Sequence, residues 1–480
     1  MRIDSILKKT LGLTILTDDQ CEEIHLASLE VLDSIGVKVY DEEALELLHG
    51  AGARIDGNLA RIPAWMVQEA LAAAPCRVPI GDRNGNRAML LEKGRSYYGT
   101  GSDTQTTIDI YSGERRETTK QDVVHAATLI DALEQIDFAM SMAIASDVPV
   151  TSSYLHQFEA MLINTTKPFV YTAEHKQDVL DMIEISEIAA GGAEALQQNP
   201  FMILYSEPSS PLKHTETALQ KSLLCAEKRL PVMYIPAIML GASGPVTSAG
   251  SIIVANAEVL SGLVMHQLKA KGAPFIYGGS APPMDMRTTI CSYGAPEAIL
   301  NDAAIISMSR YYNLPDFCTA GCTDSQSFDQ QAGLEAAFSM LLLGLAGGTL
   351  IHDLGYMGAG MTSSMEMVVM TNEIASMVRH VIGGVEISPV TKAMEVIRKV
   401  GPGGDFLSED HTFENFKEHL HFSELLNRWG YEGWKNEGGL DFGERANRRV
   451  REIIENHTPE PLPPEVEREI HTIIDRREKH

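Results

Sequence analysis

The sequence predicts an α/β fold: a TIM-type (β/α)8 barrel with an N-terminal helical cap and a C-terminal helical extension. Short apolar runs alternate with helical stretches, and successive runs start roughly 30 to 43 residues apart, the length of one βα unit. The runs are apolar throughout rather than at every second residue, which indicates strands buried on both faces of a parallel sheet. No phosphate-binding glycine motif follows them, which favours a barrel over a doubly wound sheet.

Seven barrel strands are visible as apolar runs that follow one another along the chain. They are expected at Phe138–Ala145, Pro168–Ala173, Pro200–Ser206, Pro231–Pro236, Pro274–Gly278, Asp316–Ala320 and Gly348–His352. The eighth strand should come either from Val385–Ser388 or from the region around Tyr97. Eight units close the sheet on itself, so the barrel domain should span residues 96–400.

The first region, residues 1–95, is expected to form the helical cap. Thr17 and Asp41 each precede a helical stretch as candidate N-caps, and Pro63 begins a third helix, because proline suits a first turn. Turn residues at Gly81–Gly85, and again at Tyr111–Glu114 in the barrel region, predict two hairpins.

The last region, residues 401–480, differs in composition and should form the helical extension. Trp429, Tyr431 and Trp434 stand among charged helical segments, and Pro459–Pro464 interrupts the chain before a final polar helix. We expect this tail to wrap the barrel or to form a contact between copies, so the protein should be a homo-oligomer.

Charge and cysteine content argue against several classes of protein. The formal net charge of −26 argues against binding nucleic acid, which needs clusters of Lys and Arg. Six scattered cysteines without a C-x-x-C pair suggest a reduced, cytoplasmic chain. Met1–Thr10 lacks an apolar signal core, and the apolar stretch Ala336–Ile351 is short and rich in glycine. We therefore expect a soluble, cytoplasmic protein with no nucleic-acid or membrane partner.

Candidate site residues follow the predicted strands, because the active site of a TIM barrel lies at the carboxyl ends of its strands. His352, Glu207 and Asp324 are the candidate catalytic residues. His352 directly follows a buried strand and has Asp353 beside it; the alternative is a histidine bonded to a neighbouring carbonyl.

The loops after the strands carry acids, amides and aromatics but few basic residues, which does not suit a phosphorylated substrate. The mixture suits a quaternary ammonium, which has no N–H to donate and is held by aromatic faces and a nearby negative charge. Candidate substrate-binding tyrosines are Tyr97, Tyr98, Tyr293 and Tyr356, with Asp103, Glu207 or Asp324 as counter-charge. Each tyrosine taken singly could instead be core packing.

Arg287 is the clearest basic exception in these loops. Its guanidinium could bind a substrate carboxylate with two hydrogen bonds, or it could form an internal salt bridge. The chain has no Walker loop, no nucleophile elbow and no His-Glu-x-x-His. The pair His419 and His421 lies in the polar tail, so we expect no metal bound by this chain.

Five segments in this order resemble the trimethylamine methyltransferase superfamily, and most closely its members that lack pyrrolysine, such as glycine betaine methyltransferase. The segments are Leu29–Val39, Thr107–Glu117, Gly279–Arg287 with Gly294–Glu297, Thr323–Glu335, and Phe406–Thr412. The resemblance implies a TIM barrel whose open end receives a separate corrinoid protein. It also implies that the corrinoid belongs to that partner, so this chain should bind no cofactor of its own.

The resemblance also bears on the substrate. Trimethylamine enzymes of this superfamily carry pyrrolysine in the loop that matches roughly Ser327–Gln331, where this chain has ordinary residues, including the candidate substrate-binding residue Gln331. This difference points to a quaternary amine, with glycine betaine first and proline betaine, carnitine and γ-butyrobetaine open. A quaternary amine already carries its activating charge, so Co(I) could take the methyl group without a general acid.

Two other classes stay open from sequence. A TIM-barrel lyase or aldolase would need a Schiff-base lysine or metal-binding carboxylates at strand ends, and Lys213 is the only lysine in the loops considered above. A non-catalytic betaine-binding protein would carry the same loops, because cobalt does the chemistry and few catalytic side chains are needed.

Overall fold

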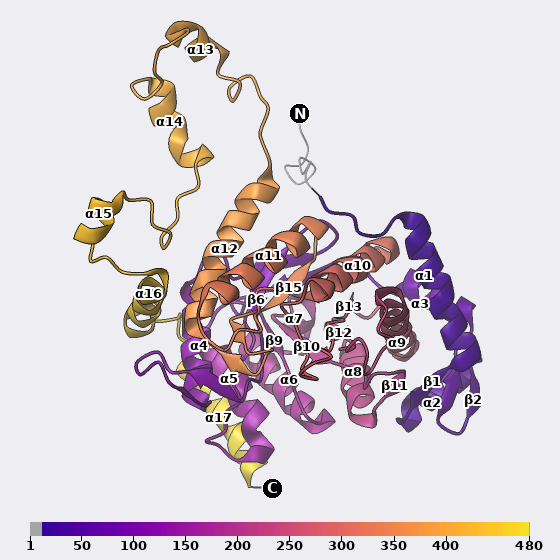
Figure 1. Ribbon diagram of the computed structural model, residues 1–480. Coiled ribbons are helices and arrows are strands. Elements are labelled where there is room, and N and C mark those ends of the chain that lie inside the picture. Colours follow the sequence, from indigo (N-terminus) through magenta and orange to yellow (C-terminus); the bar gives the residue numbers. More distant parts are fainter. Residues whose placement is uncertain (1–11, 480) are drawn as a thin grey trace.

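Parallel strands curl around a common axis in the computed structural model, which describes residues 12–479 (Figure 1). Seven of them form one sheet in the order β6–β15–β14–β13–β12–β10–β9. Their bounds are β6 Tyr97–Thr100, β9 Phe169–Tyr171, β10 Met202–Ser206, β12 Val232–Tyr234, β13 Phe275–Gly278, β14 Asp316–Thr319 and β15 Leu350–Leu354. The predicted βα rhythm is therefore confirmed.

Residues 138 and 139 complete the circle between the two edge strands. Phe138 pairs in parallel with Gly99 of β6, and Ala139 pairs in parallel with Phe169 of β9. This short link takes the place of the predicted strand Phe138–Ala145, and β6 is the strand expected around Tyr97. The alternative, Val385–Ser388, is wrong, because those residues form no strand.

The barrel interior is filled at the amino ends of the strands by a hairpin of β4 (Val78–Gly81) and β5 (Arg87–Leu91). Side chains from both hairpin strands and from the barrel strands form one buried cluster that includes Ile80, Met89, Phe138, Ile276 and Phe317. The hairpin therefore closes one end of the barrel and leaves the carboxyl ends of the strands as the open end.

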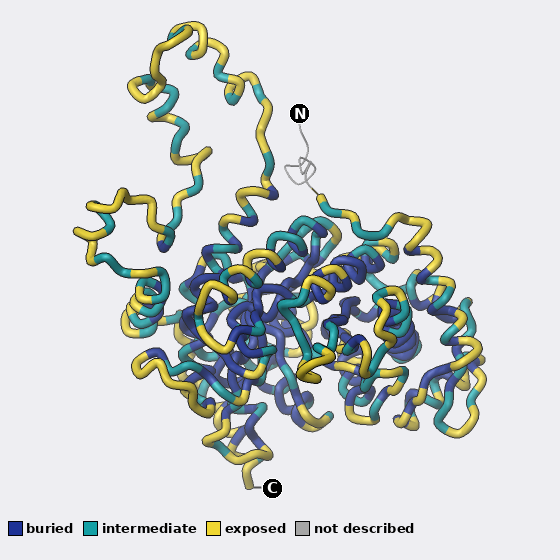
Figure 2. Tube along the Cα trace, in the orientation of Figure 1, coloured by how far each residue is buried: buried dark blue, intermediate teal, exposed yellow. Residues whose placement is uncertain are grey.

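A ring of helices surrounds the strands, and Figure 2 shows the buried core inside it. The ring contains α4 Lys120–Ala132, α5 Ser153–Asn164, α6 Lys176–Ala190, α7 Ala193–Gln198, α8 Glu216–Lys228, α9 Ser248–Lys269, α10 Pro296–Tyr312, α11 Gln330–Ala346 and α12 Met365–Gly383. Among the described residues, α9 alone is long and apolar enough to cross a membrane, but 72% of its apolar window is buried inside the protein. A long apolar helix that is mostly buried is also typical of a protein core.

The N-terminal region begins its helices where the sequence predicts. Thr17 caps α1 (Asp18–Glu30), Asp41 caps α2 (Glu42–Ala51), and Pro63 precedes α3 (Ala64–Ala73). The region also holds β1 (Val37–Val39), β2 (Arg54–Asp56) and β3 (Leu59–Arg61), which are too short to show an alternating pattern. β1 pairs with β11 (Lys213–His214) and so ties this region to the loop after β10.

Smaller elements border the open end of the barrel. β7 (Thr106–Ile108) and β8 (Arg115–Glu117) pair as an antiparallel hairpin, and so do β4 and β5, which confirms both predicted turns. β16 (Tyr356–Met357) and β17 (Thr362–Ser363) extend the β7–β8 sheet.

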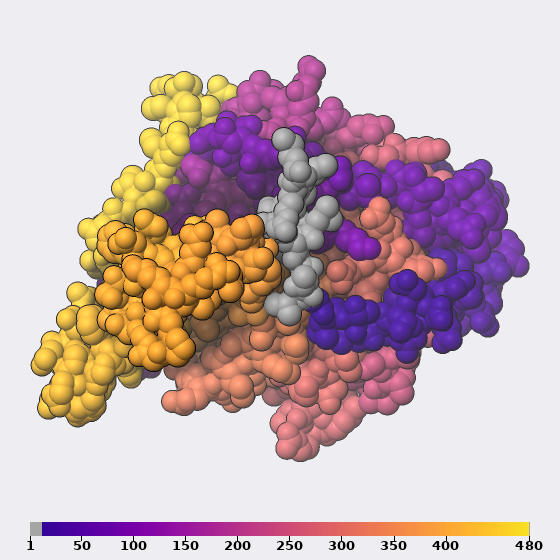
Figure 3. Space-filling model, turned by 90° about the horizontal axis from the view of Figure 1, so that it is seen from above, coloured from indigo at the N-terminus to yellow at the C-terminus, as the bar shows by residue number. Residues whose placement is uncertain are grey.

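After α12 the chain leaves the barrel in an arm, which we define as residues 384–430. The arm contains α13 (Met394–Val400) and α14 (Asp410–His419), and neither has a buried residue. It leads into α15 (Tyr431–Asn436), and Figure 3 shows it as an orange lobe on the side away from the indigo N-terminal region. The chain then returns through α16 (Phe442–Asn456), against α12 and α4, and α17 (Pro464–Glu478), against α6.

Candidate active site

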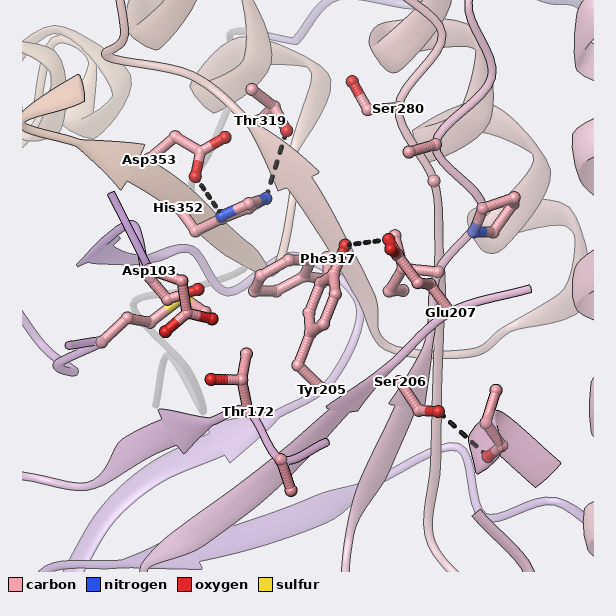
Figure 4. Close-up of a pocket in the computed structure, with 18 of the residues that line it drawn as sticks. Asp103, Thr172, Tyr205, Ser206, Glu207, Ser280, Phe317, Thr319, His352 and Asp353 are labelled. Atoms are coloured by element: carbon pink, nitrogen blue, oxygen red, sulfur yellow. Dashed lines mark hydrogen bonds and ion pairs between the residues drawn. The ribbon is translucent and has the colours of Figure 1, made fainter. Parts of the chain in front are cut away.

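An open cavity of about 570 Å³ lies at the carboxyl ends of the barrel strands (Figure 4). Residues at or just beyond the ends of all eight strand positions line it: Ser102, Asp103, Met140, Thr172, Ala173, Tyr205, Ser206, Glu207, Ile235, Pro236, Ala237, Gly279, Ser280, Phe317, Thr319, His352, Asp353 and Tyr356. The site is therefore in the place that the predicted fold requires.

His352 is held at the end of β15 from three sides. Its Nε2 lies 3.1 Å from the Thr319 hydroxyl, and its ring stacks on Phe317 with centroids 3.8 Å apart and planes at 18°. Its Nδ1 lies 2.7 Å from an Asp353 carboxylate oxygen, outside hydrogen-bond geometry. Figure 4 shows the imidazole between Thr319 and Asp353.

Asp353 has a strained backbone at the cavity wall. Its φ is +74°, a region that residues with a Cβ rarely adopt, although Asp tolerates it better than most. Strain of this kind persists where the surrounding structure imposes it, and it is common at functional sites. The result is a carboxylate that is only 6% exposed and faces the cavity beside an imidazole.

Two more carboxyl groups face the cavity from other strands. The Tyr205 hydroxyl donates to Glu207 over 3.0 Å. The Glu207 side chain is open to the cavity, but the surrounding protein still raises its pKa by desolvation. The Ser141 hydroxyl donates to Asp103 over 3.2 Å. Burial raises the pKa of Asp103 as well, and neighbouring hydroxyls, first that of Thr172, oppose the rise.

Tyr356 and Tyr293 are the two predicted cage tyrosines that reach the cavity. The Tyr356 ring packs where a Cβ on Gly101 would lie, 2.2 Å from the nearest ring atom, so only glycine fits there. Its hydroxyl donates to the carbonyl of Ser102. The backbone N–H groups of Tyr293 and Gly294 donate to the carboxylate of Asp324 over 2.9 and 3.1 Å, which fixes the loop that presents Tyr293.

The cavity is rich in aromatic rings and acids. Five aromatic rings line it, those of Tyr154 on α5, Tyr205, Tyr293, Phe317 and Tyr356. Three carboxyl groups line it as well, those of Asp103, Glu207 and Asp353. Lys221 of α8 is the one lysine or arginine among the lining residues. Faces of aromatic rings and carboxylates attract a cation, so this composition suits a positively charged ligand.

Half of the predicted site residues lie in the cavity and half do not. His352, Glu207, Asp103, Tyr293 and Tyr356 line it. Asp324 lies behind it and positions the Tyr293 loop. Tyr97, Tyr98, Arg287 and Gln331 lie elsewhere, so the structure gives them no place in a cage around a ligand in this cavity.

Tyr97 and Tyr98 are displaced because they open β6 rather than follow it. The Tyr97 hydroxyl bonds the backbone N–H and C=O of Leu90 in β5, at the closed end of the barrel. Tyr98 points outward, 1% exposed, with the Arg379 guanidinium 5.1 Å from its ring centroid. Both are structural residues of the barrel wall.

Arg287 and Gln331 are exposed and already partnered. The Arg287 side chain is 88% exposed and pairs with Asp285 over 2.8 Å, which is the internal salt bridge given above as its alternative role. Gln331 lies in the first turn of α11 and donates to Glu335 over 2.9 Å. None of the residues 327–331 lines the cavity. Among the described residues, no group of three His, Cys, Asp or Glu side chains could hold a metal ion.

The residues missed by sequence reasoning lie on helices or inside strands. Lys221 and Tyr154 reach the cavity from α8 and α5, where nothing in the local sequence distinguishes them from ordinary helix residues. Tyr205 and Phe317 occupy strand positions that look like core. The polar neighbour Glu207, two residues after Tyr205, was the only signal that could have pointed to that tyrosine.

Replacing Tyr97 with Phe should lower the free energy of unfolding by about 1–2 kcal/mol, because it removes the hydroxyl that satisfies two backbone groups of Leu90. Ligand binding in the cavity should not change, because Tyr97 lies at the other end of the barrel. Thermal unfolding and ligand titration of the same preparation measure both. Weaker ligand binding with unchanged stability would contradict this placement.

Stability should fall as pH rises from about 6.5 to about 8, above the range in which the buried His214 and His266, with pKa values lowered to about 3 and about 4, act in the opposite direction. Burial raises the pKa of Asp302, behind Ser280 and Thr319, to about 8, and those of Glu258 and Asp316 to about 7 and about 6. Between about pH 4 and these values the native protein keeps protons that the unfolded chain has released. Each group therefore costs about 1.4 kcal/mol per pH unit in its window.

The pH dependence of the unfolding midpoint tests this expectation. Asp302→Asn should flatten the curve between about pH 6.5 and about pH 8, and Asp285→Asn, at a half-buried carboxylate, should leave it unchanged in that range. A wild-type midpoint that rises with pH from about 6.5 to about 8 would show that Asp302 and Glu258 are ionised in the native protein.

Comparison with known proteins shows which family the chain resembles. The family model described as trimethylamine methyltransferase (MTTB) matches residues 2–480. Trimethylamine methyltransferase MttB of Desulfitobacterium hafniense is 32% identical over 469 residues, which cover 97% of this chain and 94% of that protein. Glycine betaine methyltransferase of the same species is 31% identical over 467 residues, 97% of each.

Solved structures support the fold. The monomethylamine methyltransferase MtmB of Methanosarcina barkeri aligns with a TM-score of 0.53 at 13% identity, covering 94% of this chain and 89% of that one. A hydroxylamine complex of MtmB gives 0.54 at 12% identity, covering 94% and 91%. The match of the family model over nearly the whole length, together with the 32% identity, shows that this chain belongs to the trimethylamine methyltransferase family.

Proposed function

We propose that the protein takes a methyl group from a quaternary amine, with glycine betaine as the first choice, and transfers it to the Co(I) of a separate corrinoid protein. One observation carries the proposal: the cavity at the open end of the barrel combines five aromatic side chains and three carboxyl groups with a single lysine. A permanent cation without an N–H is held by aromatic faces and negative charge. The likeness to a glycine betaine methyltransferase supports the same substrate class.

The reaction requires the protein to position the substrate rather than to supply a proton. Co(I) of the partner, the methyl acceptor, forms a bond to one N-methyl carbon while the C–N bond breaks. The bonding pair stays on nitrogen, so glycine betaine leaves as dimethylglycine and no general acid is required. The barrel orients the methyl group towards its open end and excludes water from the rest of the cavity.

The substrate loses its positive charge in this step, which decides how the carboxylates act. A strong counter-charge binds the substrate better than the transition state and gives no acceleration. Burial raises the pKa of Asp103 and of Glu207, because the enclosing protein disfavours their charged forms. Aromatic faces and the carboxylate of Asp353 then orient the ammonium.

An assay with free cob(I)alamin tests the proposal and names the substrate. The purified protein is mixed with cob(I)alamin and one amine at a time, and methylcobalamin is followed by its absorbance. The panel contains glycine betaine, proline betaine, carnitine, γ-butyrobetaine and trimethylamine. We expect turnover with at least one quaternary amine and none with trimethylamine. Tight binding without turnover would indicate a betaine-binding protein, and turnover with trimethylamine alone would overturn the substrate class.

The corrinoid and its carrier protein are part of the proposal. We propose that the corrinoid protein docks over the open end of the barrel, because the cavity is reached from there and the opposite end is closed by the β4–β5 hairpin. This chain then needs no resident cofactor.

We also propose that the protein is a homo-oligomer in which a second copy covers the arm. The arm exposes Leu407 (86%) and Phe413 (80%), and the outer faces of α11 and α12 expose Leu334 (70%) and Phe338 (47%) among others. Both surfaces belong to one chain, so two copies can each lay the arm across α11 and α12 of the other and close a two-fold dimer. A standard interface needs about 20 to 30 residues a side, which residues 384–430 can supply.

Light scattering after size-exclusion chromatography checks this assembly. The double variant Leu407→Glu with Phe413→Glu should shift a dimer to the monomer mass, because two charges would be buried without partners. Val150→Glu, at a side chain that is 84% exposed on the barrel, is the matched control and should stay dimeric. A monomeric wild-type protein would show that the arm has another occupant.

A further inference from the structure

Lys221 is the one lysine or arginine among the residues that line the cavity. Its Nζ donates to the carbonyl of Ala173, and among residues 12–479 no carboxylate lies within ion-pair distance of it. An ammonium group has three N–H donors, so two of them have no protein partner. Burial lowers the pKa of Lys221, and the charge of Glu207 opposes this. An anion in the cavity would satisfy both the charge and the free donors.

The wall around Lys221 is suited to an anion for a second reason. Ser209, Thr215 and Thr217 line the same cavity from the loop after β10 and the start of α8. Thr215 is the N-cap of α8, a helix of 13 residues, and Lys221 lies in its second turn. The first turn of a helix carries partial positive charge, and hydroxyl groups donate hydrogen bonds to carboxylates.

His352 and Asp353 lie across the barrel from Lys221. The strand order places β10, which leads into α8, four positions from β15, with β12, β13 and β14 on one side and β9, residues 138–139 and β6 on the other. His352 and Asp353 are in β15 and line the cavity. The cation of Lys221 and the carboxyl group of Asp353 therefore lie at opposite ends of one diameter of the barrel.

Two carboxyl groups modify this polarity without removing it. Asp103 and Glu207 influence the charge of Lys221, but neither forms an ion pair with it. Burial raises the pKa of both acids, because the enclosing protein disfavours their charged forms. Arg287, the residue expected from sequence to bind a carboxylate, is exposed and engaged with Asp285. Lys221 is thus the cation left to perform that role.

Resting on the proposed function, we infer that Lys221, with the hydroxyl groups at the start of α8, binds the carboxylate of a zwitterionic quaternary amine while the β15 wall holds its trimethylammonium group. Lys221 then determines specificity. It selects substrates that carry both charges over quaternary amines that carry only the positive one. The contact is made equally in the ground state and the transition state, so it should act on KM rather than on kcat.

Lys221→Met tests the inference, because methionine keeps most of the length and removes the charge. The assay uses glycine betaine, or the betaine selected by the panel, and tetramethylammonium, which has no carboxylate. We expect kcat/KM for the betaine to fall about 30-fold through KM and kcat/KM for tetramethylammonium to stay within about two-fold. Calorimetric titration should show the same loss of betaine affinity without cob(I)alamin. Lys221→Arg should restore most of that affinity.

Controls separate the subsite from the fold and from the proposed function. Lys213→Met removes an exposed lysine outside the cavity and should change neither substrate. An equal loss for both substrates in Lys221→Met, or unchanged betaine affinity, would overturn the inference and leave the proposed function standing. If the wild-type protein methylates cob(I)alamin from neither substrate, the proposed function fails instead. Thermal unfolding of each variant confirms that it is folded.

Discussion

Asp353→Asn is expected to raise KM for the quaternary amine about 50-fold and to raise kcat with it, so that kcat/KM falls by much less than KM rises. Asp353 is the cavity carboxylate that lies beside His352, at 2.7 Å, and it is only 6% exposed. Its attraction for the ammonium exists in the bound substrate and disappears as the C–N bond breaks. Removing it should therefore weaken binding without slowing the transfer step.

The replacement is structurally mild. Asn tolerates the positive φ of +74° at this position as well as Asp does, and it keeps a side-chain oxygen near His352. The measurement is the initial rate of methylcobalamin formation over a range of amine concentrations. Asp285→Asn, at a half-buried acid outside the cavity, is the matched control and should behave as wild type. A large fall in kcat with unchanged KM would mean that Asp353 acts on the transition state.

Phe317→Ala should have the largest effect on stability, a loss of about 3–5 kcal/mol in the free energy of unfolding. Phe317 is 1% exposed inside the barrel, stacks on His352, and has its ring centroid 5.9 Å from that of Tyr205. The substitution leaves a cavity between the core and the site. It also frees both site side chains, so methyl transfer should fall at least about ten-fold.

Two variants make the Phe317 result interpretable. Phe317→Leu keeps most of the volume and should cost about 1 kcal/mol or somewhat more while losing the stacking on His352. Phe413→Ala, in the arm and 80% exposed, should change the stability of a monomer by less than about 0.5 kcal/mol. Chemical denaturation followed by circular dichroism gives the comparison. A Phe317→Ala protein as stable as wild type would contradict the packing described here.

Strand positions were predictable from sequence because parallel barrel strands are buried on both faces. Continuous apolar runs such as Val232–Tyr234 and Phe275–Gly278 stand out against the helices between them. The link at residues 138–139 and the strands of the N-terminal region were harder to predict, since pairs and triplets of residues carry no periodicity. The arm could not be foreseen, because a helix that exposes apolar residues looks the same in sequence as one that buries them.

The site was predictable where a polar residue directly follows a strand. His352 and Glu207 were identified in this way, and both line the cavity. Tyr97 was misplaced because the direction of a strand matters: it opens β6, whereas Asp103 lies beyond its end. Lys221 could not be identified because it reaches the cavity from a helix, and which face of α8 points inward depends on tertiary packing.

The central claim is that the cavity selects a permanently charged N-methyl group, and one binding comparison tests it most directly. Isothermal titration calorimetry is performed with glycine betaine, or the betaine that the panel selects, and with its carbon isostere, 3,3-dimethylbutanoate in the case of glycine betaine. The two ligands share shape and carboxylate and differ in the charge on the central atom. We predict that the betaine binds at least about ten-fold more tightly. Equal or tighter binding of the neutral-headed isostere would contradict the claim.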